Sequence, residues 1–576
     1  MKPPLFVSLL LLALIVPLTR AGAATAERRP NIILIMTDDQ GYGDFGIMGN
    51  PVLDTPHLDQ LAREAATMST FYVSPVCSPT RAALMTGRYN YRTRVIDTFK
   101  GRSMMEPEEV TVAEALGSAG YATGIFGKWH LGDNYPLRPS DQGFQESLIH
   151  RGGGLGQPSE PIENNRRYTD AILFRNNEQV QTKGYCTDVF FSAALDFIDQ
   201  AAKQDRPFFA YIAPNAPHSP YHDVPVALYE KYRRRDLTPV LLGATKDADT
   251  VARVYAMVEN IDMNVGRLVD ALERRQLTSR TIVIFMNDNG PNTRRFVGPL
   301  RGMKSEVHEG GIRTPFFMRW PERLRAGAAS DRIAAHIDIM PTLLEAAGVA
   351  KPAGTTFDGR SFLPLLEGKP VDWPDRHLVL QTHRGDTPIP FHHAAIRNQR
   401  WKLLHPSGSG RETMPPNIPY ELYDMEADPG ERENRADAHP EVVNQLQEAY
   451  AGWYKNVAAT RPDNFAPPLI VVGTPHETET VLTTQDKRTV ENAWLLHFAT
   501  PGTYNVELRW KEPTPAATVE VRISGETREL SVAASATSAR INHWKIPAGN
   551  AALSTAIITG PKAAEPYHVI LHQAPR

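Results

Sequence analysis

A series of short, almost continuously apolar runs constrains the fold of this chain more than any other feature. These runs cover residues 31–36, 121–126, 208–212, 281–286 and 315–318. A strand with one face in water alternates apolar and polar residues, so an unbroken apolar run predicts a strand buried on both faces. The segments between them have helical patterns. One covers 55–67 and begins with Thr55-Pro56; the other covers 247–277 with apolar residues at helical spacing. This alternation predicts an α/β fold, with a large, mixed, mostly parallel sheet sandwiched by helices.

The pattern changes after about residue 375. Residues 395–404 and 420–423 resemble short antiparallel strands, and a helical stretch covers 440–454. They predict a small α+β subdomain over 376–457. Three prolines in 458–468 predict a linker. Beyond it, apolar and polar residues alternate, which predicts a β-rich appendage over 469–576 with no assigned role. Its Trp510 and Trp544 are candidate sugar platforms, but core packing is the preferred interpretation.

The N-terminus has the organisation of a secretory signal. Lys2 precedes an apolar stretch over 5–18, and small residues follow up to Ala26. The stretch is shorter than the roughly 20 residues that a spanning helix needs. Residues 1–26 are therefore predicted to be a cleaved signal peptide, with export to the periplasm or the extracellular space and no membrane association afterwards. A formal net charge of -3 gives no indication of a nucleic-acid partner.

Polar clusters follow four of the predicted strands where each strand ends. They cover residues 37–41, 127–132, 215–218 and 287–290. In open parallel sheets, functional sites lie beyond the carboxyl ends of the strands. The four clusters are therefore predicted to meet at one edge of the sheet.

Two of these clusters contain paired oxygen ligands. Asp38 and Asp39 follow one strand, and Asp288 and Asn289 follow another. Adjacent carboxylates repel each other without a cation, and oxygen ligands favour Ca²⁺ or Mg²⁺ over zinc. Either pair alone is also typical of a turn or a helix cap. Two pairs at two strand ends predict a metal site.

A third motif places a cysteine at the start of a helix. Pro79 suits the first turn of a helix that Gly87 would end, so Cys77 would lie at its N-terminus with Arg81 on the same face. Backbone N–H groups and a guanidinium there suit an oxyanion. A small buried residue is the alternative for Cys77. It is the preferred interpretation for Cys186, the only other cysteine.

The sequence Cys77-Ser-Pro-Thr-Arg81, with Thr86-Gly-Arg88 behind it, resembles the signature of the type I, formylglycine-dependent sulfatases of the alkaline phosphatase superfamily. Further motifs resemble that family in the same chain order, over about residues 30–455. They are Asp38-Asp-Gln-Gly-Tyr-Gly-Asp44, Gly127-Lys-Trp-His-Leu-Gly132, Asn215-Ala-Pro-His218, Asp288-Asn-Gly290, Leu300-Arg-Gly-Met-Lys304, Glu309-Gly-Gly-Ile-Arg-Thr-Pro315 and Leu422-Tyr-Asp424 with Asp428-Pro-Gly-Glu431.

The resemblance implies an alkaline-phosphatase-like catalytic domain over 27–375 that hydrolyses sulfate monoesters. It implies that a formylglycine-generating maturation enzyme oxidises Cys77, and that the hydrated aldehyde attacks sulfur. It implies one Ca²⁺, with Mg²⁺ less favoured, held by Asp38, Asp39, residue 77, Asp288 and Asn289. It also implies that Arg81 supports residue 77, His130 assists sulfate elimination, Lys128 and Lys304 hold the sulfate, and His218 lies near the leaving alcohol. A sulfated glycan is the first expectation for the substrate, with other sulfate esters as alternatives.

Several alternatives remain open at this point. A phosphodiesterase or phosphonate monoester hydrolase would use the same scaffold, and an inactive relative would only bind glycans. The glycine-rich residues 151–157 would either admit a bulky substrate or form a flexible surface turn. The remaining scattered histidines are expected to be structural or exposed: His57, His222, His308, His392 and His393.

Overall fold

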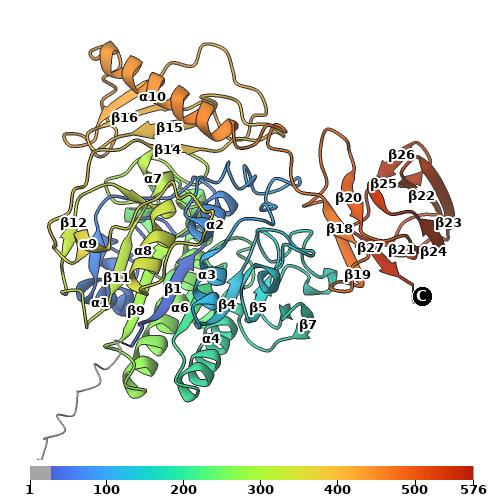
Figure 1. Cartoon of the computed structure of the whole chain (residues 1–576), viewed down its shortest axis with the longest axis horizontal. Coiled ribbons are helices and arrows are strands. Elements are labelled where there is room, and N and C mark those ends of the chain that lie inside the picture. Colours follow the sequence, from blue (N-terminus) through green and yellow to red (C-terminus); the bar gives the residue numbers. More distant parts are fainter. Residues whose placement is uncertain (1–27, 575–576) are drawn as a thin grey trace, which may run out of the picture.

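The computed structural model describes residues 28–574, so the predicted signal peptide lies outside the described residues. Its centre is a ten-stranded mixed sheet with the order β12-β2-β11-β9-β1-β8-β4-β5-β6-β7 (Figure 1). The strands are β1 (Asn31–Thr37), β2 (Ala66–Met68), β4 (Ala122–Lys128), β5 (Glu146–His150), β6 (Ile172–Arg175), β7 (Glu178–Gln181), β8 (Phe208–Ala213), β9 (Thr281–Asn287), β11 (Phe316–Arg319) and β12 (Ala329–Ser330).

The five central strands β9, β1, β8, β4 and β5 run parallel, and antiparallel pairs flank them on both sides. Every residue of β1 is buried. Its side chains alternate between two cores, with Ile32 and Leu34 in one and Ile33 and Ile35 in the other. The unbroken apolar runs therefore mark strands that are covered on both faces, as the sequence predicts.

Helices cover the two faces of the sheet. On one face lie α2 (Cys77–Thr86), α3 (Val112–Ser118), α8 (Ile339–Ala346) and α9 (Leu363–Leu366). On the other lie α1 (Pro56–Glu64), α4 (Cys186–Lys203) and α6 (Ala248–Arg274), and α5 (Val226–Arg233) packs on α6. The short α7 (Glu309–Ile312) directly precedes β10 (Arg313–Thr314). This strand pairs with β3 (Phe71–Tyr72), which also pairs with β13 (Ala334–Ala335), to form a small three-stranded sheet.

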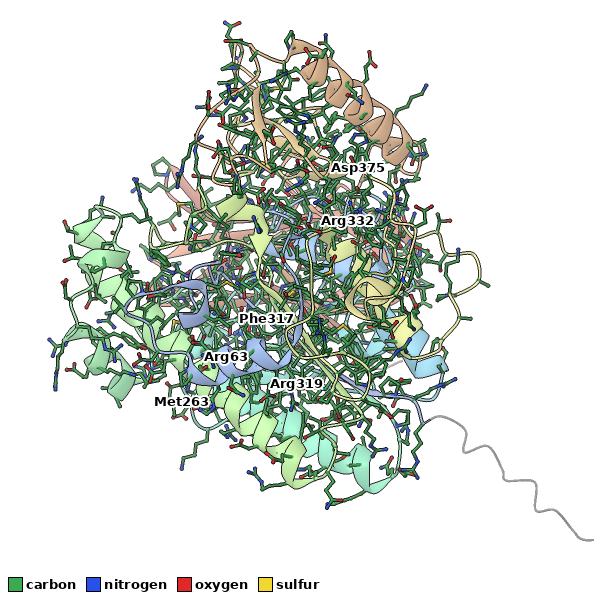
Figure 2. The ribbon with its side chains drawn as sticks, turned by 90° about the vertical axis from the view of Figure 1, so that its left-hand side faces the viewer. Arg63, Met263, Phe317, Arg319, Arg332 and Asp375 are labelled. Carbon is green, nitrogen blue, oxygen red and sulfur yellow. The ribbon has the colours of Figure 1, made fainter. Side chains whose placement is uncertain are left out.

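The helix predicted over 55–67 is shorter in the structure. Helix α1 ends at Glu64, because Ala65 adopts an extended conformation and the next residues form β2 beside β11. Tertiary strand pairing thus overrides the local helical pattern. Figure 2 shows this side of the molecule, with Phe317 of β11 beneath α1 and with Arg63 and Met263 on the outer surfaces of α1 and α6.

The predicted α+β subdomain contains a four-stranded antiparallel sheet, and helix α10 (Pro440–Ala458) packs on it. The helix runs four residues beyond its predicted end. The strands are β14 (Leu378–Gln381), β15 (Ala394–Arg397), β16 (Trp401–His405) and β17 (Glu421–Asp424). In Figure 1 this unit lies over the end of the large sheet, beside α2 and α7.

The C-terminal residues form a β-sandwich, and its two sheets share one hydrophobic core. One sheet contains β18 (Ile470–Val472), β20 (Trp494–Phe498), β22 (Ala517–Ile523), β23 (Glu526–Val532), β25 (Gly549–Thr559) and β26 (Lys562–Ala564); the other contains β19 (Glu479–Thr483), β21 (Gly502–Arg509), β24 (Ser538–Ile546) and β27 (His568–Gln573). Trp510 and Trp544 are only 6% and 1% exposed, so core packing is confirmed for both.

The predicted fold class is confirmed, with its large mixed sheet, its small α+β unit and its β-rich C-terminal part. Among the helices of residues 28–574, none combines the length and the apolar composition that crossing a bilayer requires.

Candidate active site

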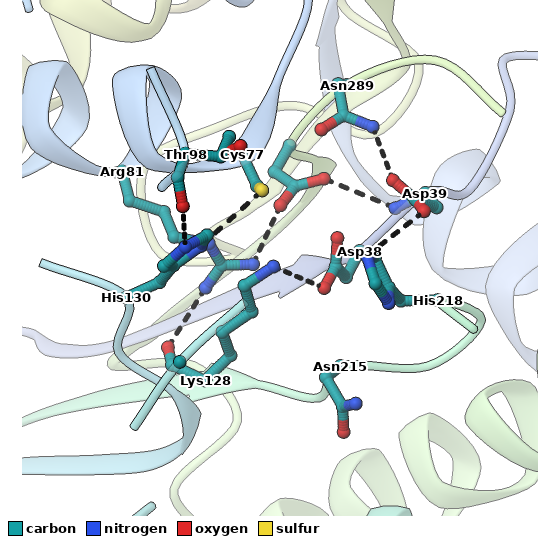
Figure 3. A network of polar contacts seen from close by, with 12 residues as sticks. Asp38, Asp39, Cys77, Arg81, Thr98, Lys128, His130, Asn215, His218 and Asn289 are labelled. Carbon is teal, nitrogen blue, oxygen red and sulfur yellow. Dashed lines mark hydrogen bonds and ion pairs between the residues drawn. The ribbon is translucent and has the colours of Figure 1, made fainter. Parts of the chain in front are cut away.

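Parallel pairing of β1 and β9 brings the two acidic motifs together. Thr37 and Asn287 are partners in register, and the Asp288 amide donates to the Thr37 carbonyl at 3.0 Å. Asp38 (Figure 3) and Asp288, the next residue of each strand, therefore lie at one sheet edge. Ligand atoms of Asp38, Cys77 and Asp288 lie within 4.8 Å of one another, and the same holds for Asp38, Asp39 and His218.

Three buried oxygens in this cluster accept no hydrogen bond from the residues that the structure describes. They are Asp38 Oδ1, Asp39 Oδ2 and Asn289 Oδ1. Buried polar atoms are nearly always paired, because an unpaired one loses its hydration without compensation. Three unpaired buried oxygens from neighbouring residues match the donor set of a hard divalent cation.

Helix α2 presents Cys77 to this cluster. All ten of its residues are buried, and Gly87 ends it in the left-handed conformation at φ 67°, as the sequence predicts. The Thr80 hydroxyl donates to the Asp288 carbonyl at 2.7 Å, which fixes the helix to the end of β9. Arg81 donates to Asp288 Oδ2 at 2.8 Å and to the Lys128 carbonyl at 3.0 Å. The guanidinium thus joins the ends of β9 and β4 beneath residue 77.

Two lysines surround the acidic cluster. Lys128 Nζ lies 2.7 Å from Asp38 Oδ2, and Lys304 Nζ lies 2.6 Å from Asp39 Oδ1. Burial opposes the ionisation of Asp39, but Lys304 and His218 outweigh it and hold its pKa below the usual value. For Lys304, burial is outweighed by Asp39, which raises the pKa of the ammonium group. Lys304 is therefore charged at neutral pH, and each of the two lysines contacts one of the acidic residues.

Two histidines contact the same cluster. His130 Nε2 lies 2.8 Å from the Thr98 carbonyl and Nδ1 lies 3.5 Å from Cys77 Sγ, so the ring joins residue 77 to a backbone acceptor. His218 Nδ1 lies 2.7 Å from the Ser219 carbonyl, and its Nε2 lies 3.7 Å from Asp39 Oδ2. Burial lowers the pKa of His130 well below its ordinary value and that of His218 to about 3. Both rings are neutral near pH 7.

Burial also shifts the remaining acids. It raises the pKa of the Cys77 thiol, and the nearby lysines only partly offset this effect. Burial and the neighbouring Asp38 raise the pKa of Asp288 to about 6, although Arg81 opposes the shift. A cation between Asp38 and Asp288 would remove their mutual repulsion.

The structure brings all the predicted site residues into one cluster. It also places Gly153 and Gly154 against the two histidines, because a Cβ on Gly153 would lie 2.9 Å from His130 and one on Gly154 would lie 2.8 Å from His218. The glycine-rich segment therefore lines the site, with residues 152–155 buried. Of the other histidines, His57 and His222 are exposed, whereas His308, His392 and His393 are buried and hydrogen-bonded.

Two residues at the site carry no sequence signal that would have identified them. Thr98 contributes only its carbonyl, and Gln485 lies 355 residues from His130, whose ring it contacts. The predicted role of Cys186 as a small buried residue agrees with its full burial in α4.

Comparison with protein families agrees with this geometry. The family model described as Sulfatase matches residues 30–349, and the model described as N-sulphoglucosamine sulphohydrolase, C-terminal, matches residues 303–454. N-acetylgalactosamine-6-sulfatase of Canis lupus familiaris is 33% identical over 409 residues, which cover 65% of this chain and 72% of that protein. Arylsulfatase A of Homo sapiens is 32% identical over 470 residues, covering 74% and 88%.

Solved structures show the same similarity. Ps i-CgsB, in complex with k-i-k-neocarrahexaose, has a TM-score of 0.64 and 28% identity and covers 74% of this chain and 92% of its own. The Sulfatase model alone matches more than half of the chain. The protein therefore belongs to the sulfatase family of the alkaline phosphatase superfamily and is an enzyme that hydrolyses sulfate esters.

Proposed function

We propose that this sulfatase removes sulfate from a sulfated glycan, using formylglycine at position 77 and one bound Ca²⁺. The observation that carries the proposal is the convergence of Asp38, Cys77 and Asp288 within 4.8 Å, inside a ring of lysines and histidines. Three loops that are far apart in sequence build this pocket at the edge of the sheet. The charges and the spacing of these groups suit a cation beside an anion such as sulfate.

The donor set supports a hard cation. Asp38, Asp39, Asp288, Asn289 and the oxidised residue 77 would hold it, and three of these oxygens are unpaired and buried. When bound, the ion supplies Lewis-acid chemistry that makes an oxygen of residue 77 a better nucleophile. Ca²⁺ is favoured over Mg²⁺, because Mg²⁺ usually keeps several waters and avoids sites made of protein oxygens alone.

The state of Cys77 supports oxidation of its side chain. Burial raises the pKa of the thiol, so an unmodified Cys77 stays protonated near pH 7 and is a poor nucleophile. Oxidation to an aldehyde, which hydrates to a geminal diol, supplies an oxygen nucleophile at the same position. A formylglycine-generating enzyme is the partner that this step requires.

The chain's own residues hold the anion and move the protons. Lys128 and Lys304 turn their ammonium groups toward the pocket that would hold the sulfate oxygens, where cationic contacts stabilise the charge that develops in the transition state. Because His130 Nε2–H donates to the Thr98 carbonyl, Nδ1 keeps its lone pair toward residue 77 and can take a proton there. His218 lies across the pocket, beside Asp39, and is assigned to the side of the leaving alcohol.

A glycan is the substrate class that the comparisons support. The similar proteins include an N-acetylgalactosamine-6-sulfatase and a protein solved with a carrahexaose. With the predicted signal peptide, such an enzyme would act on extracellular or periplasmic glycans.

The test is a substrate panel on the purified enzyme, with and without Ca²⁺. Sulfated oligosaccharides, an aryl sulfate, a phosphodiester and a phosphonate monoester are compared by kcat/KM. Mass spectrometry of the peptide that ends at Arg81 reports the state of residue 77. We expect sulfated oligosaccharides to be preferred and residue 77 to be an aldehyde. A preference for the phosphodiester or phosphonate, or an unmodified thiol in active enzyme, would contradict the proposal.

A further inference from the structure

The C-terminal β-sandwich reaches the active site through the turn that follows β19. Residues Gln485 and Asp486 of this turn are 6% and 3% exposed, so they are buried against the large domain. The Gly101 amide donates to the Gln485 carbonyl at 2.8 Å. A Cβ on Gly101 would lie only 3.2 Å from the Asp486 carbonyl oxygen, so a bulkier residue there would press on the turn. The turn is therefore fixed to the loop that carries Thr98.

Gln485 and His130 share one acceptor. His130 Nε2 lies 2.8 Å from the Thr98 carbonyl oxygen, and Gln485 Nε2 donates to the same oxygen. The two side-chain nitrogens lie 3.3 Å apart. A carbonyl oxygen has two lone pairs, so it accepts both N–H groups. This arrangement places the proton of the neutral imidazole on Nε2 and leaves the Nδ1 lone pair toward residue 77 (Figure 3).

The other side of Thr98 is held by the α+β unit. The Thr98 amide donates to Asp97 Oδ1 at 2.7 Å. Arg384 contacts the same carboxylate oxygen at 2.5 Å and the Thr98 hydroxyl at 3.2 Å. The peptide that receives His130 is thus held between Arg384 on one side and Gln485 on the other. Without Gln485, its carbonyl would keep only the His130 donor and would lose one of its two supports.

We propose that Gln485 is a positioning residue for His130 and that the β-sandwich is consequently an integral part of the active site. This inference rests on the proposed role of His130 as the proton acceptor beside residue 77. The sandwich begins beyond residue 454, where the match to both family models has ended. The large domain and the α+β unit therefore supply only part of the hydrogen-bond network that orients the His130 ring, and Gln485 of the β-sandwich supplies the rest.

The test compares the full-length variants Gln485→Met and Gln485→Ala with the wild type. Methionine keeps the length of the side chain without its donor, so the sandwich stays docked. Asn542→Ala is the matched control, because this exposed amide on β24 lies in the same sandwich. With an aryl sulfate as substrate, we expect kcat of Gln485→Met to fall about 10- to 100-fold, the size of effect seen when an outer hydrogen-bond partner of a metal-ligating histidine is lost. KM should change less than about twofold, because Gln485 orients a base and does not hold the substrate.

A second readout reports the ring itself. In enzyme labelled with ¹⁵N-histidine, the wild-type His130 should give the shifts of a neutral ring protonated on Nε2, with the signal assigned by His130→Gln. Gln485→Met should shift the signal toward a mixture of tautomers, whereas Asn542→Ala should not. If the wild type turns over substrate and Gln485→Met keeps its kcat and its tautomer, the inference is wrong. If the wild type hydrolyses no sulfate ester but the tautomer changes in Gln485→Met, the proposed function fails and the positioning role stands.

Discussion

Two buried ionic clusters differ in how fully their charges are paired. The site cluster comprises Asp38, Asp39, Arg81, Lys128, Asp288 and Lys304. The paired cluster comprises Tyr72, Glu309, Arg397, Lys402 and Glu431, at the contact between the large domain and the α+β unit. Every carboxylate oxygen of the paired cluster has a partner: Lys402 contacts both Glu309 and Glu431, Tyr72 donates to Glu309, and the Glu309 amide donates to Glu431.

The carboxylate oxygens of the site cluster are not all paired. Within residues 28–574, Asp38 and Asp39 each have one oxygen that accepts a hydrogen bond and one that accepts none, although both side chains are fully buried. Buried charges are tolerated when they are paired and hydrogen-bonded. The paired cluster satisfies this condition with protein groups alone. The site cluster leaves oxygens available to a ligand. Buried charge therefore stabilises a domain contact in the paired cluster and is suited to binding an ion in the site cluster.

The largest expected effect is on catalysis at the site cluster. Cys77→Ala removes the residue proposed as the nucleophile, so kcat should fall on the order of 10⁴-fold or more. The matched control is Cys186→Ala, because Cys186 is equally buried but lies on α4 in the hydrophobic core. Steady-state kinetics with an aryl sulfate measure both variants. Comparable activity in the two variants would show that residue 77 is not the nucleophile and that the site cluster does not surround the reacting group.

A stability loss is expected when the paired cluster is broken. Lys402→Met leaves Glu309 and Glu431 buried together without their shared ammonium group, so the free energy of unfolding should fall by about 3–5 kcal/mol. Urea denaturation measures the change, with Lys455→Met as a control because that lysine is exposed on α10. Activity per folded molecule should stay within about twofold of the wild type. A stable but inactive Lys402→Met protein would mean that the paired cluster acts in catalysis.

Removal of the ion should affect only the site cluster. A cation that binds the folded state at 100 times its Kd stabilises it by about 2.7 kcal/mol. Chelation should therefore lower the thermal midpoint, and Ca²⁺ should restore it. This response should disappear in Asp38→Asn, which removes a charged ligand, and persist in Lys402→Met. A Ca²⁺ response that survives in Asp38→Asn would place the ion elsewhere.

The smallest effect concerns a third buried carboxyl, at the contact with the sandwich. Burial raises the pKa of Glu477 from 4.5 to about 7, although Arg138 opposes the shift. The pKa of Glu477 is higher in the folded state than in the unfolded state. The contribution of this carboxyl to stability is therefore complete below pH 4.5 and is lost as the pH rises toward 7. The expected loss across this window is on the order of 2 kcal/mol. Denaturation at several pH values should show it in the wild type.

Glu477→Gln removes the titrating group and keeps the shape of the side chain. Its stability should vary less with pH between 4.5 and 7 than that of the wild type. An unchanged pH dependence in this variant would show that the interface carboxyl is paired as fully as those of the paired cluster.

The sequence predicted the sheet and its site because both depend on local patterns. Apolar runs mark the strands that are buried on both faces, and polar motifs at their carboxyl ends mark the edge where they meet. The start of α2 at Cys77 and its end at Gly87 also follow from local rules. The end of α1 did not, because β2 forms only when β11 lies beside it.

The different roles of the two clusters were not readable from the sequence. The motif at residues 309–315 and the one at 38–44 both resemble the same family. Yet Glu309 is paired by Lys402, whereas one oxygen of Asp38 accepts no hydrogen bond from the described residues. Pairing depends on which side chains from other segments reach each carboxylate. That is a property of contacts between distant residues, and no local pattern records it.

By itself, then, the sequence determined the α/β class and the family to which the chain belongs, and it predicted the residues that cluster at the candidate site. Only the tertiary structure decided that the glycine segment lies against both histidines, and that Gln485 of the sandwich shares the Thr98 carbonyl with His130. The physical reason is the distance along the chain over which each interaction acts. Periodicity and helix capping act within a few residues, whereas the contact of the His130 ring with Gln485 joins residues 355 positions apart in the chain.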